Sequence, residues 1–118
     1  MRNYRQLVAW QVAFELVKAT YLATAKFPRE EMYGLTAQMR RAAVSIASNI
    51  AEGAGRTTQK DFSQFVTISR ASLNELETQW LIALDLGYLP NEDINLEPII
   101  ERLYGLLNGL RNSLNAER

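Results

Sequence analysis

A stripe of polar side chains in the middle of the chain has the residue types and the spacing to do chemistry. Its members recur every three or four residues, and they are Arg41, Ser45, Asn49, Glu52 and Arg56. In an α-helix of about 3.6 residues per turn, this spacing places all of them on one face. Three interpretations are open: a polar network between helices or subunits, with Glu52 bridged to Arg56; a phosphate-binding surface; or catalysis.

The phosphate interpretation draws on the cations in and beside this stripe. The candidate donors to a nucleic-acid backbone are Arg40, Arg41, Arg56 and Lys60. Residues 1–60 contain 9 basic and 4 acidic side chains, whereas residues 61–118 contain 4 basic and 9 acidic ones. The basic half could therefore meet a polyanion, or the two halves could orient helices or subunits against each other.

The composition removes most catalytic chemistry. The 118 residues include no His and no Cys, which leaves no imidazole base, no His-ligated metal and no thiolate metal site. The Glu-x-x-His pairs of a di-iron bundle are excluded on the same ground. No phosphate loop and no G-x-S-x-G motif occurs in the sequence. We therefore expect no enzyme activity, no cofactor and no metal.

Four amphipathic segments must position these side chains. Their apolar periodicity predicts helices over residues 7–25, 34–54, 59–86 and 96–115. Thr58 is the expected N-cap of the third helix, with Asp61 three residues later, and Gly87 is its expected end. Asn95 is the expected N-cap of the fourth. Together these features predict one all-α domain over residues 1–118, an antiparallel up-down-up-down four-helix bundle.

The apolar stripes also predict which side chains form the core. The first helix should bury the stripe Leu7, Trp10, Phe14, Val17 and Tyr21. The fourth should bury Ile99, Leu103, Leu106, Leu110 and Leu114, with Ile100 and Leu107 alongside. Close packing would explain its Gly105 and Gly109. We expect Trp10 and Trp80 to anchor the core, and Tyr33 either to pack over the bundle end or to stack on a base. The apolar face of the third helix is wider than one seam needs, which favours a second partner.

One run of the sequence is highly specific. It reads Phe27-Pro28-x-x-Glu31-x-Tyr33-Gly34-Leu35-Thr36-x-Gln38-Met39-Arg40-Arg41-Ala42-Ala43-Val44-Ser45-Ile46-x-Ser48-Asn49-Ile50-Ala51-Glu52-Gly53. Over roughly residues 4–90 the chain resembles the bacterial four-helix-bundle proteins known as 23S rRNA-intervening-sequence proteins. This resemblance implies a homopentamer. It also connects the chain to the accessory variability proteins of diversity-generating retroelements, pentameric barrels that bind nucleic acid and a reverse transcriptase.

The resulting hypothesis is a non-enzymatic, ring-like homo-oligomeric scaffold that binds RNA or DNA through its Arg-rich second helix, together with a protein partner. The alternative is a protein-interaction adaptor without nucleic-acid contact, suggested by the net charge of zero. The longest apolar run, Leu81-Ile82-Ala83-Leu84, is far shorter than the ~20 residues that span a bilayer. We expect no membrane contact and a cytoplasmic location.

Overall fold

The computed structural model describes residues 3–90 and 94–116, and within them the chain is all-α, with no strand. Its four α-helices are α1 (Val8–Thr24), α2 (Leu35–Ala54), α3 (Gln59–Asp85) and α4 (Glu97–Ala116). Two short 3₁₀ helices, η1 (Asn3–Gln6) and η2 (Arg29–Glu31), precede α1 and α2. Each α-helix begins and ends within one residue of the predicted range.

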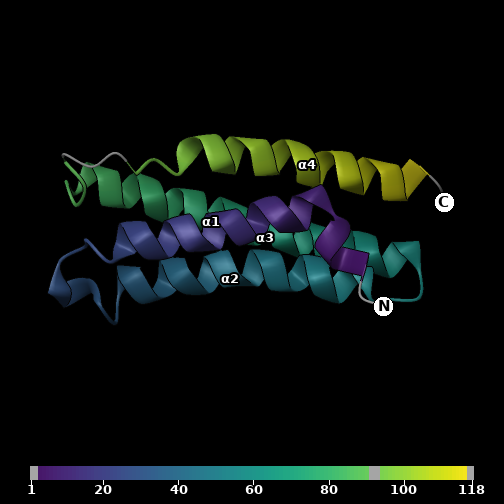
Figure 1. Ribbon diagram of the computed structural model, residues 1–118, viewed down its shortest axis with the longest axis horizontal. Helices are drawn as coiled ribbons and strands as arrows, with labels where there is room; N and C mark the ends of the chain where they lie inside the picture. Colours follow the sequence, from purple (N-terminus) through teal and green to yellow (C-terminus); the bar gives the residue numbers. More distant parts are fainter. Residues whose placement is uncertain (1–2, 91–93, 117–118) are drawn as a thin grey trace.

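The helices lie along one another in a rod 46 Å long and about 22 Å across (Figure 1). α1 packs against α2 and α4, and α3 packs against the same two helices. In the described residues α1 and α3 make no close approach, so they occupy opposite corners of the bundle. No helix in this part of the chain is both long and apolar enough to cross a membrane.

Hydrogen bonds between neighbouring helices fix the direction of two pairs. Ser45 on α2 bonds to Ser72 on α3, and Gly53, later in α2, faces Phe65, earlier in α3. α2 and α3 therefore run in opposite directions. In the same way Ser63 near the start of α3 bonds to Asn115 near the end of α4, so these two helices are also antiparallel.

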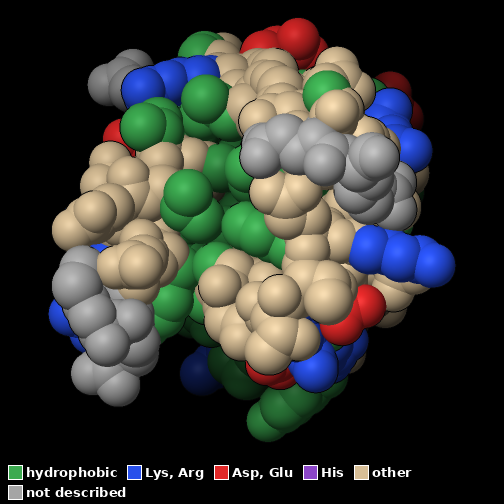
Figure 2. All heavy atoms as spheres, turned by 90° about the vertical axis from the view of Figure 1, so that its right-hand side faces the viewer, with side chains coloured by type: hydrophobic (Ala, Val, Ile, Leu, Met, Phe, Trp, Pro, Cys, Tyr) green, Lys and Arg blue, Asp and Glu red, His purple; other side chains and the backbone are tan. Residues whose placement is uncertain are grey.

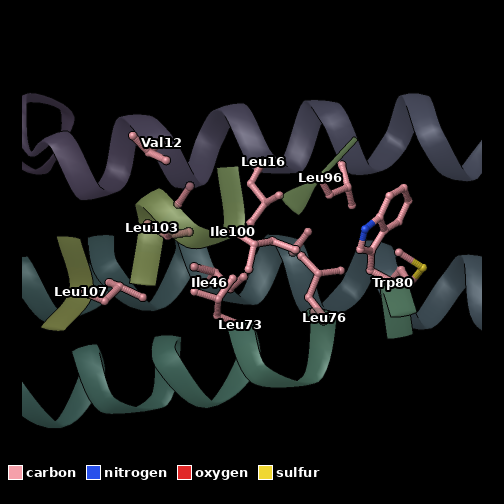
Figure 3. Packing of buried hydrophobic residues seen from close by; sticks show 14 of the residues in the cluster. Val12, Leu16, Ile46, Leu73, Leu76, Trp80, Leu96, Ile100, Leu103 and Leu107 are labelled. Atoms are coloured by element: carbon pink, nitrogen blue, oxygen red, sulfur yellow. The ribbon is translucent and has the colours of Figure 1, made fainter. Parts of the chain in front are cut away.

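The core fills the centre of the rod with large apolar side chains from all four helices (Figure 3). Leu16 of α1, Ile46 of α2 and Leu103 of α4 are fully buried, and Leu73 and Trp80 of α3 are no more than 1% exposed. Each such side chain contributes about 1.5–3 kcal/mol relative to exposure. The prediction that Trp80 anchors the core is confirmed, although its indole Nε1 has no hydrogen-bond partner among the residues that the structure describes.

The core face of α1 differs from the predicted stripe. Its buried side chains are Ala9, Val12, Ala13, Leu16, Thr20, Ala23 and Thr24. Phe14 and Tyr21 of the predicted stripe are 50% and 43% exposed. Trp10 is only half-buried, and its ring lies 5.2 Å from that of Phe14. Two helical stripes overlap in this sequence, and the one rich in small side chains faces inward because it lets neighbouring helices approach closely.

The face of α4 that is buried in the structure is rotated slightly about the helix axis from the predicted apolar stripe. The buried residues are Ile100, Leu103, Leu107 and Leu114, with Ile99, Leu106 and Leu110 half-buried at the margin. A Cβ added at Gly105 or Gly109 would meet no atom of residues 3–90 and 94–116 within 4 Å. Close packing within the described chain therefore does not account for these two glycines.

The ends of the helices follow the predicted capping chemistry. The Thr58 hydroxyl accepts the Asp61 N–H at 3.1 Å, and the Asn95 side chain accepts the Glu97 N–H at 3.1 Å. Gly87 has a φ of +76°, and the N–H that follows it donates back to the Ala83 carbonyl at 3.1 Å. This is the left-handed termination that glycine allows without strain.

One carboxylate joins the two connections at the η2 end of the rod. Glu31 Oε1 accepts the Leu35 N–H at 3.0 Å and so caps α2, while Glu31 Oε2 accepts the Tyr88 hydroxyl at 2.7 Å. The Tyr88 hydroxyl and then the Leu35 amide lower the pKa of Glu31 below its ordinary value of 4.5. A Cβ on Gly34 would lie 2.7 Å from Glu31 Oε1, so the glycine leaves room for this carboxylate.

Candidate nucleic-acid interface

The middle of the polar stripe on α2 is a hydrogen-bonded network with α3. The Ser45 and Ser72 hydroxyls lie 3.0 Å apart, and Asn49 Nδ2 donates to the Ser45 carbonyl at 2.8 Å and to its hydroxyl at 3.1 Å. All three side chains are half-buried. Beside them the fully buried Ser69 hydroxyl donates to the Ile46 carbonyl at 3.0 Å. These contacts hold α2 and α3 in register, as the structural interpretation of the stripe requires.

The ends of the stripe have a different environment. Arg41, Glu52 and Arg56 are exposed. Glu52 forms no ion pair with Arg56 in the described part of the chain, although their spacing predicts one. The Arg56 guanidinium instead lies over the Phe65 ring, with 4.7 Å between Cζ and the ring centroid. This cation–π contact orients the guanidinium while leaving its edge open to solvent.

Arg40 is tied to the neighbouring helix. Its Nε donates to the Thr24 hydroxyl at 2.9 Å, and its guanidinium lies 4.5 Å from the centroid of the Tyr21 ring. Its side chain is half-buried. Because these contacts use one edge and one face of the guanidinium, Arg40 serves first to hold α1 against α2.

The predicted cations do not form a single patch. Arg40 and Arg41 lie near the start of α2, whereas Arg56 and Lys60 lie around its end and the first turn of α3. At 1.5 Å per residue, α2 extends about 20 Å along its axis from Arg41 to its last residue, Ala54, and Arg56 follows beyond that end. The structure thus divides them into two groups that only an extended ligand could contact together.

The end of the rod that carries Arg56 and Lys60 also has a cation that the sequence did not single out. Figure 2 views this end, where hydrophobic side chains are visible in a central hollow and Lys and Arg side chains stand around the rim. Arg111 of α4 lines an open groove together with Lys60. A single Arg in an amphipathic helix belongs to no recognisable sequence motif. Only the packing of α3 against α4 shows that Arg111 and Lys60 line the same groove.

Tyr33 is 92% exposed. The interpretation that it packs over the bundle end is therefore wrong. It directly precedes Gly34, the N-cap position of α2, and follows η2, which the Glu31 carboxylate fixes. An aromatic ring on such a fixed turn is available for stacking.

Carboxylates gather farther along the rod, at the seam between α3 and α4. Oxygen atoms of Glu77 on α3 and of Glu97 and Glu101 on α4 lie within 4.8 Å of one another, close enough to share a hard cation. Burial, and then the charges of Glu97 and Glu101, raise the pKa of Glu77 above its ordinary value of 4.5. The acidic half of the sequence thus becomes an acidic surface at the α3–α4 seam.

These features define an all-helical bundle with separate cationic and acidic surfaces. Residues 5–109 match the family model of the 23S rRNA-intervening sequence proteins. The match covers most of the chain, so the chain belongs to this family. Among curated proteins, no sequence matches the chain significantly.

Proposed function

We propose that this protein is a non-enzymatic scaffold that binds RNA or DNA through its exposed cations and assembles into a ring-like homo-oligomer, a pentamer. The observation that carries the nucleic-acid assignment is the set Arg41, Arg56 and Lys60. All three are exposed and form no ion pair within the described residues. Cations left free in this way can neutralise phosphates at little desolvation cost.

The separation of the cations favours a polymer over a small anion. The rise of about 20 Å along α2 between the two groups corresponds to about six phosphates of one strand of a duplex. A single small anion would contact only one group. The contact of Arg56 with the Phe65 ring supports the proposal further, because a guanidinium that is already oriented loses less conformational entropy on binding.

Exposed apolar side chains support assembly. Phe14 and Leu22 on α1 are 50% and 62% exposed, and Ile68 and Leu81 on α3 are 47% and 51% exposed. The open space around Gly105 and Gly109 would let another helix approach α4 closely. Repetition of the cations by each copy would raise the avidity for a long strand without any new contact. The antiparallel pairs α2–α3 and α3–α4 are those expected of an up-down-up-down subunit.

The test is a titration of fluorescently labelled single-stranded RNA with the purified protein at about 50 and 200 mM salt. We expect a steep loss of affinity at the higher salt concentration. The variants Arg41→Glu and Arg56→Glu should each weaken binding, and the double variant should lose it. Arg102→Glu, which makes the same single change of an exposed cation on α4, should retain most of it. Absence of binding by the parent at low salt, or equal binding by the double variant and Arg102→Glu, would refute the assignment. Sedimentation velocity measures the oligomer, and a monomer at all concentrations would refute the ring.

The acidic surface favours a second candidate function, an adaptor that binds a protein partner. The carboxylates of Glu77, Glu97 and Glu101 form a surface that repels nucleic acid and suits a basic protein. A pull-down with and without nuclease separates the two functions. Partners that persist after nuclease treatment and disappear with Glu97→Gln/Glu101→Gln would support the adaptor. Loss of every partner on nuclease treatment would exclude it.

A further inference from the structure

A groove of about 460 Å³ lies between the first turns of α3 and the last turns of α4, at the end of the rod seen in Figure 2. Lys60, Gln64 and Thr67 line its α3 side, and Arg111 and Asn115 line its α4 side. The volume is within the range of small-molecule sites. Nothing described above assigns a ligand to this groove.

The sequence builds the groove from two regular helix faces. Residues 60, 64 and 67 are spaced by four and three, and residues 111 and 115 by four, so each set lies along one side of its helix. The Ser63 hydroxyl donates to Asn115 Oδ1 at 2.8 Å across the two helices. The Thr67 hydroxyl donates to the Ser63 carbonyl at 3.1 Å. The Ser63–Asn115 bond sets the separation of the two walls before any ligand arrives, and the Thr67 bond fixes a side chain of the α3 wall.

The groove has a positive electrostatic balance. Among the described residues, its lining contains two cations, Lys60 and Arg111, and no carboxylate. Neither cation forms an ion pair within residues 3–90 and 94–116. The N-terminus of α3 and the C-terminus of α4 meet here, so their helix dipoles oppose each other and largely cancel. The two side-chain charges therefore determine which ligands are attracted.

We propose that this groove binds a phosphate group, held between Lys60 on one wall and Arg111 on the other. A phosphate has several acceptor oxygens and up to two negative charges, so it can receive hydrogen bonds from both walls at once. The planar guanidinium can donate two parallel bonds, and the ammonium supplies a compact charge. The Gln64 amide adds a neutral donor that does not depend on charge. The phosphate belongs either to a small phosphorylated ligand or to the backbone of a nucleic-acid strand.

The inference does not depend on the proposed nucleic-acid function, since a small phosphorylated ligand would use the same two cations. If the phosphate belongs to a strand, the groove extends the surface formed by Arg56 and Lys60 onto α4. Lys60 would then be shared by both. Arg111 distinguishes the groove from the surface formed by Arg56 and Lys60, because it lines the groove and lies outside the polar stripe of α2.

The experiment titrates the full-length protein with two probes. Inorganic pyrophosphate, followed by calorimetry, reports a small phosphate ligand. A labelled single-stranded RNA of about 20 nucleotides, followed by anisotropy at several salt concentrations, reports a strand. The variants are Arg111→Gln and Lys60→Gln, with Arg102→Gln as the matched control on α4. We expect each groove variant to weaken binding about five-fold, to lower the salt slope for RNA by about 0.7, and the control to match the parent.

The outcomes distinguish the sources of the phosphate and the two proposals. If Arg111→Gln weakens the binding of RNA alone, the phosphate belongs to a nucleic-acid backbone. If it weakens the binding of pyrophosphate alone, the phosphate belongs to a small ligand. Both results support the groove as a phosphate site. Pyrophosphate binding by a parent that does not bind RNA supports the groove and refutes the nucleic-acid function. RNA binding that Arg111→Gln leaves unchanged, without pyrophosphate binding, overturns the groove alone. Binding of neither probe overturns both proposals.

A poly-glutamate peptide serves as the competing ligand class. Binding of this peptide that depends on Arg111, without binding of either phosphate probe, would make the groove an acidic-peptide site and overturn the inference. Circular dichroism of every variant verifies the fold. Lys60 is exposed, so Lys60→Gln, titrated with pyrophosphate, keeps the test valid if Arg111→Gln unfolds.

Discussion

The substitution Gly53→Ala tests how closely α2 and α3 approach. A Cβ at this position would lie 2.6 Å from Phe65 Cβ and 2.9 Å from Phe62 Cδ1. The Phe62 ring can turn aside, but Phe65 Cβ is attached directly to the α3 backbone, so the two helices must separate. Such overpacking costs about 1–3 kcal/mol, and the better helix propensity of Ala returns about 1 kcal/mol. We expect a net loss of up to about 2 kcal/mol in the free energy of unfolding.

Gly109→Ala is the matched control, because it makes the same change in a helix with no atom within 4 Å of the added Cβ. Only the higher helix propensity of Ala then acts, and we expect the free energy of unfolding to rise by about 1 kcal/mol. Urea unfolding followed by circular dichroism measures both variants beside the parent. A Gly53→Ala protein that gains as much stability as Gly109→Ala would refute the close approach. If the gain from Gly109→Ala disappears as protein concentration rises, another copy covers α4.

Three further predictions concern single side chains. The hydrogen bond from Tyr88 lowers the pKa of Glu31, so the stabilisation that the ionised carboxylate provides is present above its ordinary pKa and is lost as the pH falls. Below about pH 4.5 the urea midpoint of the parent should fall more steeply than that of Glu31→Gln, and parallel curves would contradict this. The pKa of Glu77 is raised, which means that its ionised carboxylate destabilises the folded protein. Glu77→Gln should therefore raise the urea midpoint at about pH 7, and this gain should shrink toward about pH 4 as the parent carboxyl protonates. A gain independent of pH would exclude charge as its cause. Ser69→Ala removes the 3.0 Å bond to the Ile46 carbonyl and should cost about 0.5–1.5 kcal/mol in urea unfolding, whereas no change would mean that this bond does not stabilise the fold.

The helix ends could be predicted from sequence because local chemistry determines them. Thr58 and Asn95 accept backbone N–H groups within three residues, and Gly87 adopts the left-handed conformation at the end of α3. None of these interactions requires knowledge of another helix. The polar stripe on α2 could be predicted for the same reason, since its spacing is a property of one helix.

The features that depend on a second helix could not be predicted in this way. In α1 the aromatic stripe that contains Phe14 and the stripe that contains Leu16 both have helical periodicity, and only the neighbours determine which one is buried. Arg40 is bonded to Thr24, 16 residues away. Arg111 and Lys60 line one groove across the α3–α4 seam, which no spacing within either helix indicates.

The length of the rod determines which charges act on a charged partner, although the protein has no net charge. The rod is 46 Å long, whereas the Debye length at physiological salt is about 8 Å. A partner at one end is therefore screened from charges at the other, and it responds to local charge only. A polyanion would be attracted to the Arg56 end and repelled by the carboxylates around Glu77, so encounters would be oriented before contact. Association rates should fall as salt rises even though the protein is neutral as a whole.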